Sequence, residues 1–282
     1  MKKTSLNKKI LVIGSTGFLG QSLFATLEAK GVDVYGTIRK KNTGLKKRLV
    51  LDLESETNVK DFHWKDFDII ADCSGHINYN GTLESELQNI KSNLLIPLYI
   101  ISRLSKKQKY FYCSTHAVLL PNETQNPYSL SKRMFEDCIH VADRNLSQVT
   151  IFRLPGLFGQ SRITGLLHLI KENFLTKKAL KLDLSSQKWH TMYLPRAVDI
   201  MIAIMSNKHA PRLVTIGYPL QTSIEKIIKI AESMFGYKVP IMIKKGKIDR
   251  YVPDTRVQKL FYSINLFDFE KDLREYFKML RV

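Results

Sequence analysis

Short apolar, β-branched runs alternate with longer amphipathic stretches through the first half of the chain. The runs at residues 9–13, 33–38, 48–52, 67–72, 109–114 and 149–154 have the length and composition of buried strands. The stretches at 17–30, 82–106 and 128–145 have helical periodicity. This alternation predicts an α/β fold, a doubly wound parallel sheet joined by right-handed crossovers and covered by helices on both faces.

The alternation becomes looser after residue 154. A glycine-rich stretch at 155–165 is followed by a predicted helix at 166–175, a strand at 212–216 and a helix at 223–235. We therefore predict a core of residues 1–154, to which residues 190–217 return. Residues 155–282 are predicted to form mainly a smaller, C-terminal substrate-binding lobe.

A glycine pattern follows the first predicted strand and opens the first helix. Gly14 permits a tight turn, Gly17 lets the backbone approach a pyrophosphate, and Gly20 permits close packing of helix on sheet. Free N–H groups at the helix start, with the positive end of the helix dipole, suit phosphate. The G-x-x-G-x-x-G spacing in this context predicts a Rossmann-type dinucleotide site. Its residues are Gly14, Thr16, Gly17, Phe18, Leu19 and Gly20.

The end of the second predicted strand indicates which dinucleotide binds. NAD-binding chains usually carry an acid there for the ribose 2′-hydroxyl, whereas an arginine accommodates the 2′-phosphate of NADP. Here Arg39 and Lys40 stand without a carboxylate, so we expect NADP(H) rather than NAD(H). The alternative is a solvated basic loop. Asp52, followed by Leu53, ends the third strand and is either an adenine contact or a turn former.

A tyrosine and a lysine stand four positions apart at the start of a predicted helix. Asn126 can cap this helix and Pro127 suits its first turn, so Tyr128 and Lys132 share one face. A tyrosine of ordinary pKa, about 10, is a poor acid–base group at neutral pH. An ammonium about 4 Å away lowers that pKa by about 3 units at an effective dielectric of about 20. The pair can then exchange a proton with a carbonyl oxygen as hydride moves. The alternative is a chance spacing.

Together, these motifs resemble the short-chain dehydrogenase/reductase superfamily, in its extended, nucleotide-sugar-modifying branch of NAD-dependent epimerase/dehydratase type. The resemblance is carried by residues 14–20, 113–118 and 128–132, and more weakly by 153–159, 193–199 and 215–217. It implies catalytic roles for Thr115, whose hydroxyl would bond the reacting oxygen, and for Tyr128 and Lys132. It also implies that Lys132 holds the nicotinamide ribose and that Asn93 and Ser74 lie at the cofactor. A homodimer through paired helices is implied as well.

The substrate side of the site is less well defined by the sequence. We expect contacts from His76, Thr115, Tyr128 and Arg250, with Lys244 and Lys245 as further candidates for phosphate. The family's dehydratases carry two acids after the Ser/Thr, where this chain has His116 and Ala117, so dehydration is disfavoured. Pro155 and Gly156 stand where many relatives place a phosphate-binding asparagine. This difference weakens the nucleotide-sugar assignment.

Composition excludes few classes of protein. The 282 residues carry a formal charge of +18 and 44% hydrophobic residues, and the apolar run at 94–101 is too short to cross a bilayer. The basic patches lack interleaved stacking aromatics, so we expect phosphate-bearing small ligands rather than nucleic acid or membrane. Cys73, Cys113 and Cys138 lack metal-site spacing. We therefore expect a cytoplasmic protein with reduced thiols and no metal.

Three functions remain open. The first is an NADPH-dependent reductase of a keto group, on a 4-keto deoxysugar of a nucleotide sugar or on another carbonyl compound. The second is a nucleotide-sugar epimerase with a retained NAD(P). The third is a non-catalytic NADP-binding sensor, although such relatives usually lose the tyrosine or the lysine, and this chain keeps both.

Overall fold

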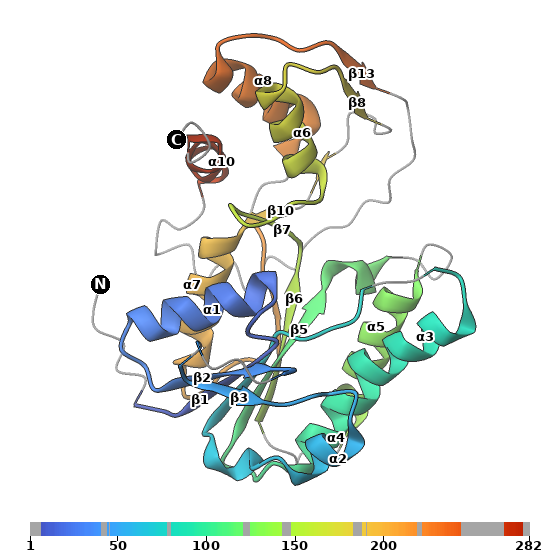
Figure 1. Ribbon diagram of the computed structural model, residues 1–282, viewed down its shortest axis with the longest axis vertical. Helices are drawn as coiled ribbons and strands as arrows, with labels where there is room; N and C mark the ends of the chain where they lie inside the picture. The colour runs from blue at the N-terminus through green and yellow to red at the C-terminus, as the bar shows by residue number, and fades with distance from the viewer. Residues whose placement is uncertain are drawn as a thin grey trace. The chain divides into compact units, whose positions relative to one another are not determined.

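The computed structural model describes residues 7–40, 44, 46–77, 80–120, 125–142, 148–182, 188–189, 191–218, 222–243 and 268–278. The chain divides into two compact units. Unit 1 comprises residues 1–154 and 198–214, and unit 2 comprises residues 155–197 and 215–282. Residues 190–197 and 215–217, predicted to return to the core, therefore belong to unit 2. Figure 1 shows the elements of both units.

Unit 1 is built on a seven-stranded sheet with the order β11-β6-β5-β4-β1-β2-β3. From β1 the chain adds β2 and β3 on one side and then crosses to add β4, β5 and β6 on the other, all in parallel pairing. The predicted doubly wound Rossmann sheet is confirmed. The strands are β1 (Ile10–Ile13), β2 (Val34–Ile38), β3 (Arg48–Val50), β4 (Ile69–Asp72), β5 (Lys109–Thr115), β6 (Gln148–Leu154) and β11 (Leu213–Thr215).

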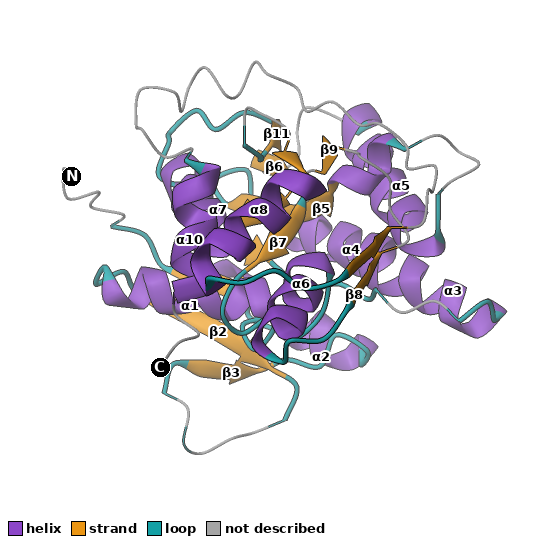
Figure 2. Cartoon of the chain, turned by 90° about the horizontal axis from the view of Figure 1, so that it is seen from above, coloured by secondary structure: helices purple, strands orange, loops and turns teal. Residues whose placement is uncertain are grey.

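Helices cover both faces of this sheet, with α1 on one face and α3, α4 and α5 on the other (Figures 1 and 2). Side chains of β1, β4 and β5, such as Leu11, Ile70 and Tyr110, are fully buried beneath Ile100 of α4 and Phe135 of α5. The helices of this unit are α1 (Phe18–Ala29), α2 (Glu56–Asp61), α3 (Leu83–Ile90), α4 (Ile96–Arg103), α5 (Pro127–Val141) and the later part of α7 (Leu194–Met205).

The single helix predicted over 82–106 is interrupted. A π-helical segment, η2 (Lys91–Leu95), separates α3 from α4, and α4 ends at Arg103. Pro97 stands in the first turn of α4, where it removes an N–H group that a regular helix would use. Such π-helical turns are frequent at functional sites.

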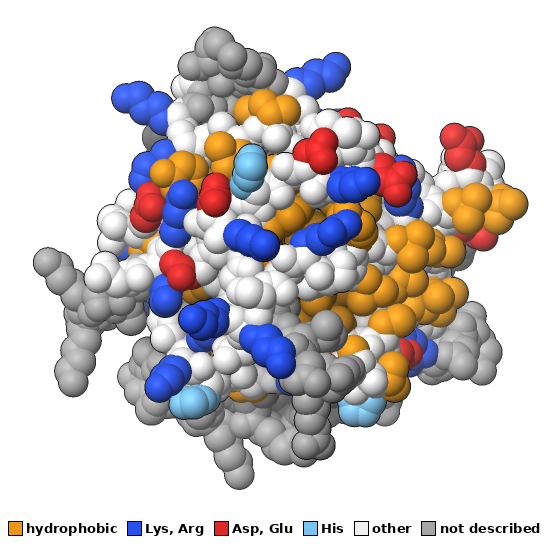
Figure 3. Space-filling view, turned by 90° about the horizontal axis from the view of Figure 1, so that it is seen from below, with side chains coloured by type: hydrophobic (Ala, Val, Ile, Leu, Met, Phe, Trp, Pro, Cys, Tyr) orange, Lys and Arg blue, Asp and Glu red, His pale blue; other side chains and the backbone are white. Residues whose placement is uncertain are grey.

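An apolar groove lies on the outer side of α2, α3 and α4. It encloses about 810 Å³ and is lined by residues such as Leu53, Leu83, Leu87 and Tyr99. Leu83 and Leu87 are 71% and 55% exposed and belong to a contiguous apolar surface, a feature that marks interaction sites. Figure 3 shows apolar side chains gathered on this side of the molecule.

Unit 2 combines short strand pairs with helices. β7 (Gly156–Phe158) pairs with β10 (Thr191–Tyr193) in parallel, and β8 (Leu180–Leu182) pairs in parallel with β13 (Ile241–Ile243). β9 (Lys188–Trp189) and β12 (Thr222–Ser223) pair antiparallel. The helices are α6 (Leu166–Leu175), α8 (Ile224–Phe235) and α10 (Phe269–Lys278). The predicted helices at 166–175 and 223–235 are confirmed.

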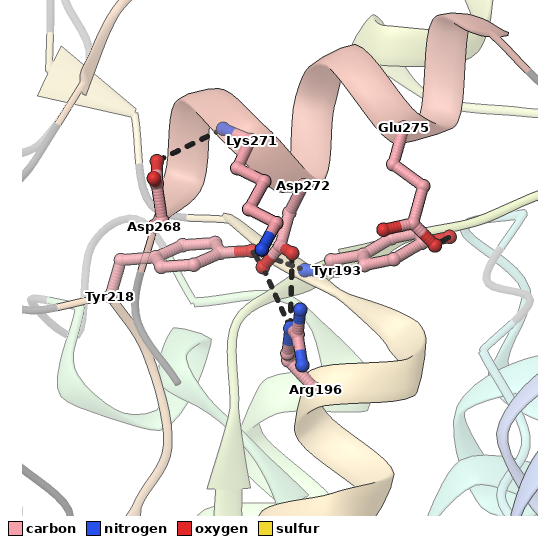
Figure 4. A network of polar contacts seen from close by, with 7 residues as sticks. All are labelled: Tyr193, Arg196, Tyr218, Asp268, Lys271, Asp272 and Glu275. Carbon is pink, nitrogen blue, oxygen red and sulfur yellow. Dashed lines mark hydrogen bonds and ion pairs between the residues drawn. The ribbon is translucent and has the colours of Figure 1, made fainter. Parts of the chain in front are cut away.

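A buried polar network attaches α10 to the rest of unit 2 (Figure 4). The carboxylate of Asp272 is fully buried and accepts hydrogen bonds from Arg196 Nε at 3.0 Å and from the Tyr218 hydroxyl at 2.7 Å. The Tyr218 oxygen in turn accepts from the backbone N–H of Tyr193 at 3.3 Å. Burial raises the pKa of Asp272, and the bonds from Tyr218 and Arg196 partly oppose that shift.

Within the described part of the chain, no helix is both long enough and apolar enough to cross a membrane.

Candidate functional site

The glycine turn links β1 to α1 through backbone contacts. Gly14 has φ +72°, a left-handed conformation that suits glycine, and a Cβ there would lie 3.0 Å from the backbone of Cys73. A Cβ on Gly20 would collide with the carbonyl oxygen of Gly14. Gly17 is the N-cap of α1, and no described side chain caps this helix. A helix N-terminus that no side chain caps is the kind of position where proteins bind phosphate.

A cavity of about 220 Å³ opens beside this turn at the carboxyl ends of β1, β2 and β4. These strands flank the point where the strand order reverses, which is where doubly wound sheets bind ligands. Eight of the predicted cofactor or substrate residues line it: Gly14, Thr16, Gly17, Arg39, Asp52, Leu53, Ser74 and His76. The cavity is lined by Gly14, Thr16, Gly17, Thr37, Ile38, Arg39, Leu51, Asp52, Leu53, Glu54, Cys73, Ser74, Gly75, His76 and Ser92.

Other predicted cofactor residues do not line this cavity. Phe18, Leu19 and Gly20 belong to α1, behind the turn, and Lys40 is exposed beyond the end of β2. Asp52 does line the cavity and also forms a turn, because its carboxylate accepts from the N–H of Glu54 at 3.0 Å. Asp52 therefore forms a turn, and its contact with adenine stays a prediction.

The loop after β4 is fixed from two sides by buried polar groups. The Asp72 carboxylate accepts from the N–H and the hydroxyl of Ser74, at 2.9 and 2.5 Å, and from the Tyr110 hydroxyl at 2.5 Å. On the other side, Asn93 Oδ1 accepts from the N–H of His76 at 3.0 Å, and Asn93 Nδ2 donates to the carbonyl of His76 at 2.9 Å. These contacts fix the backbone of the loop that forms this wall of the cavity.

Asn93 was predicted as a cofactor residue, and the structure places it one layer behind the cavity. It is fully buried in η2, and its amide also donates to Ser131 Oγ on α5 at 3.1 Å. Its own carbonyl accepts from the Tyr112 hydroxyl at 2.5 Å. In this arrangement Asn93 positions the loop that carries His76.

Lys132 is almost completely buried, with 2% of its surface exposed. Its ammonium donates to the carbonyl of Cys113 at 2.9 Å and lies 4.2 Å from the centre of the Tyr112 ring. A Cβ on Gly75 would lie 3.4 Å from this ammonium, so Gly75 separates Lys132 from the cavity. Burial lowers the pKa of Lys132, and the nearby Asp72 carboxylate partly opposes the shift.

Thr115 and Tyr128 stand at the ends of neighbouring elements. Thr115 ends β5, where its oxygen accepts from the N–H of Ala117 at 3.2 Å, which leaves the hydroxyl hydrogen for another partner. Tyr128 is the second residue of α5 and is partly exposed. The predicted cap is confirmed, because Asn126 accepts from the N–H of Ser129 at 2.9 Å. Neither Thr115 nor Tyr128 lines the cavity.

Sequence reasoning missed one buried ion pair near the predicted catalytic residues. Glu136 on α5 accepts from Ser114 Oγ at 2.5 Å and from Arg153 Nε at 2.8 Å. Ser114 and Arg153 are direct neighbours in the β5–β6 register. This trio connects α5, which carries Tyr128 and Lys132, to two strands of the sheet. Arg250, the last predicted substrate contact, lies outside the described residues, as do Lys244 and Lys245.

The fold and the glycine turn define a Rossmann-type α/β protein with a dinucleotide-binding crevice. The sequence profile of the NAD dependent epimerase/dehydratase family matches residues 10–217. The chain belongs to this family, as the resemblance of the motifs implied.

Solved structures with the same fold share little sequence with this chain. They include the ADP-L-glycero-D-manno-heptose-6-epimerase of Helicobacter pylori, with 18% identity, TM-score 0.78 and coverage of 100% of this chain and 99% of the other. The UDP-glucose 4-epimerase of Thermus thermophilus, complexed with NAD, has 15% identity, TM-score 0.75 and coverage of 97% and 99%. An NAD-dependent NDP-hexosamine 5,6-dehydratase of tunicamycin biosynthesis has 19% identity, TM-score 0.76 and coverage of 97% and 98%. At these identities the likeness shows the fold. No curated protein matched significantly.

Proposed function

We propose that this protein is an NADPH-dependent reductase of a keto group, with a 4-keto deoxysugar of a nucleotide sugar as substrate. The observation that carries the proposal is the position of Arg39 in the wall of the cavity beside the glycine turn. A guanidinium there suits a 2′-phosphate, and the uncapped start of α1 suits a pyrophosphate.

The residues around Lys132 are suited to proton transfer. When bound, the nicotinamide group supplies the hydride that reduces the carbonyl carbon. Tyr128 donates the proton to the carbonyl oxygen, and the free hydroxyl hydrogen of Thr115 orients that oxygen. The ammonium of Lys132 is buried and donates to the Cys113 carbonyl. Its positive charge would favour the ionised form of Tyr128, because charges interact strongly away from water.

An epimerase with a retained NAD(P) is the second candidate. The family description and the solved epimerases with the same fold favour it, and the UDP-glucose 4-epimerase was solved with NAD. Both reactions use the same tyrosine and lysine. They differ in whether the reduced cofactor is consumed.

The experiment that separates the two is a cofactor assay on purified protein with a panel of keto and hydroxy nucleotide sugars. A reductase oxidises one NADPH for each keto sugar reduced, which lowers the absorbance of NADPH. An epimerase converts a hydroxy sugar to its isomer, seen by NMR, without net change in NADPH. If no member of either set reacts, the nucleotide-sugar assignment fails.

We also propose that unit 2 binds the substrate and that the protein forms a homodimer through the apolar groove of α2, α3 and α4. Glu56, Glu84 and Lys91 line this groove, so in a two-fold pair in which groove meets groove an acid of one copy can face the lysine of the other. Leu83→Arg with Leu87→Arg should convert the dimer to a monomer in light scattering. Ile163→Arg, at a residue of unit 2 that is 78% exposed, is the matched control and should leave the dimer intact.

A further inference from the structure

A second cavity of unit 1 lies where the strands of the sheet begin. It encloses about 650 Å³, against about 220 Å³ for the cavity at the glycine turn. Figure 3 views the molecule from this side, where several Lys and Arg side chains stand on the surface. The residues that line it are Asn7, Lys8, Asp68, Ile69, Lys107, Lys109, Gln148, Met205, Ser206 and Lys208.

The charges of this cavity are unbalanced. Four lysines line it with a single carboxylate, Asp68. Lys8 pairs with Asp68 at 3.3 Å, and Lys109 Nζ donates to the carbonyls of Asn207 at 2.7 Å and Lys208 at 3.3 Å. Among the described residues, Lys107 and Lys208 form no ion pair within 4.0 Å. Two ammonium groups are therefore available to a ligand.

The lysines are also close enough to affect one another. The pKa of Lys109 is lowered by burial and, in addition, by the positive charge of Lys8. Like charges that share a cavity repel, and a bound anion relieves the repulsion. Gln148, at the start of β6, adds an amide that can donate to phosphate oxygens.

We propose that this cavity binds a small anion with two or more phosphate groups, independently of the dinucleotide site. β4 connects the two places, since Ile69 at its start lines the lysine cavity and Asp72 at its end holds the loop of the glycine-turn cavity. A strand of this length spans roughly 10 Å, so the two cavities lie at opposite ends of the sheet and can be occupied separately. A polyphosphate matches the spread of charge because the four lysines come from three separate segments of the chain, with Lys107 and Lys109 in one of them and Lys8 and Lys208 in the other two.

Calorimetric titration of the full chain with inorganic tripolyphosphate tests the proposal, with NADPH present in excess to fill the dinucleotide site. We expect one tripolyphosphate per chain. Lys107→Ala with Lys208→Ala should weaken binding by about tenfold. The matched control is Lys30→Ala with Lys229→Ala, which removes the same charge from two exposed lysines outside the cavity and should leave binding unchanged.

A variant that should bind tripolyphosphate more tightly keeps the proposal testable even if the double variant fails to fold. Asp68→Asn removes the carboxylate from the cavity and should tighten tripolyphosphate binding several-fold, because that carboxylate repels the anion. Absence of binding by the wild-type chain overturns the proposal, and so does an equal loss in both double variants. Parallel titrations with ATP and with orthophosphate identify the source of the phosphate groups. Binding of orthophosphate as tight as that of tripolyphosphate would also overturn it.

Discussion

Asn93 and His76 are 17 positions apart and are joined by two hydrogen bonds, in which the amide of Asn93 both donates to and accepts from the His76 backbone. These two hydrogen bonds resemble the pair exchanged by two residues in an antiparallel β-sheet, except that one partner is a side chain. It holds the loop that lines the proposed cofactor cavity, so the shape of that cavity depends on a residue that does not line it.

Replacement of Asn93 should therefore change both stability and cofactor binding. Asn93→Ala leaves the N–H and carbonyl of His76 without these partners, and we expect a loss of roughly 1–3 kcal/mol in unfolding free energy. The KM for NADPH should rise as well. Urea unfolding and steady-state kinetics measure the two effects. Asn58→Ala, at an exposed position of α2, is the control and should change neither substantially.

Tyr128→Phe removes the proposed proton donor and little else. We expect turnover to fall by roughly 100-fold to 10,000-fold, the usual contribution of a general acid. The affinity for NADPH, measured by fluorescence titration, should stay near that of the wild type. A variant with full turnover would rule out Tyr128 as the acid.

Arg39→Ala tests the choice of cofactor. If the guanidinium binds the 2′-phosphate, its loss should weaken NADPH by about 10-fold or more and leave NADH nearly unchanged. Dissociation constants for both cofactors give the answer. Equal weakening of the two would show that Arg39 does not recognise the 2′-phosphate.

Lys132→Met should separate activity from stability. Burial lowers the pKa of Lys132, so the folded protein holds this proton less tightly than the unfolded chain, and the charge does not stabilise the fold. Methionine fills a similar volume without a buried charge. We expect unfolding free energy to be retained within about 1 kcal/mol, or to increase, while turnover is lost. A variant that loses stability while its folded fraction keeps the wild-type turnover would assign Lys132 a structural role.

The buried Asp272 predicts a pH dependence of stability. Its pKa is raised in the folded protein, so the folded state binds the proton more tightly than the unfolded chain, whose aspartate has a pKa of about 3.9. Its contribution to stability is therefore greatest below that value and decreases as pH rises through the folded-state pKa. Urea midpoints measured from pH 3 upward should show a decreasing component at pH values above about 3.9 that Asp272→Asn removes. An unchanged slope in the variant would contradict the assignment.

Local patterns in the sequence were enough to predict the sheet, the glycine turn and the cap of α5. Residues adjacent in the chain determine these elements, such as the strands at 34–38 and 109–115 and the turn at Gly14. The support of the site depends on distant residues. Lys132 meets the Cys113 carbonyl 19 positions away, and Asn93 meets Ser131 38 positions away. No periodicity encodes such pairs, because each forms only after the strands and helices have packed.

The π-helical segment between α3 and α4 makes this region sensitive to chain length. A π-helical turn holds one residue more than an α-helical turn, so the helices on either side keep the faces they present. Deletion of Ser92 would therefore restore regular α-helix and leave the faces of α3 and α4 in place. What the deletion would remove is the wide turn that carries Asn93, whose amide holds the backbone of His76. At this position a change of one residue in length would alter the proposed cofactor cavity rather than the apolar groove.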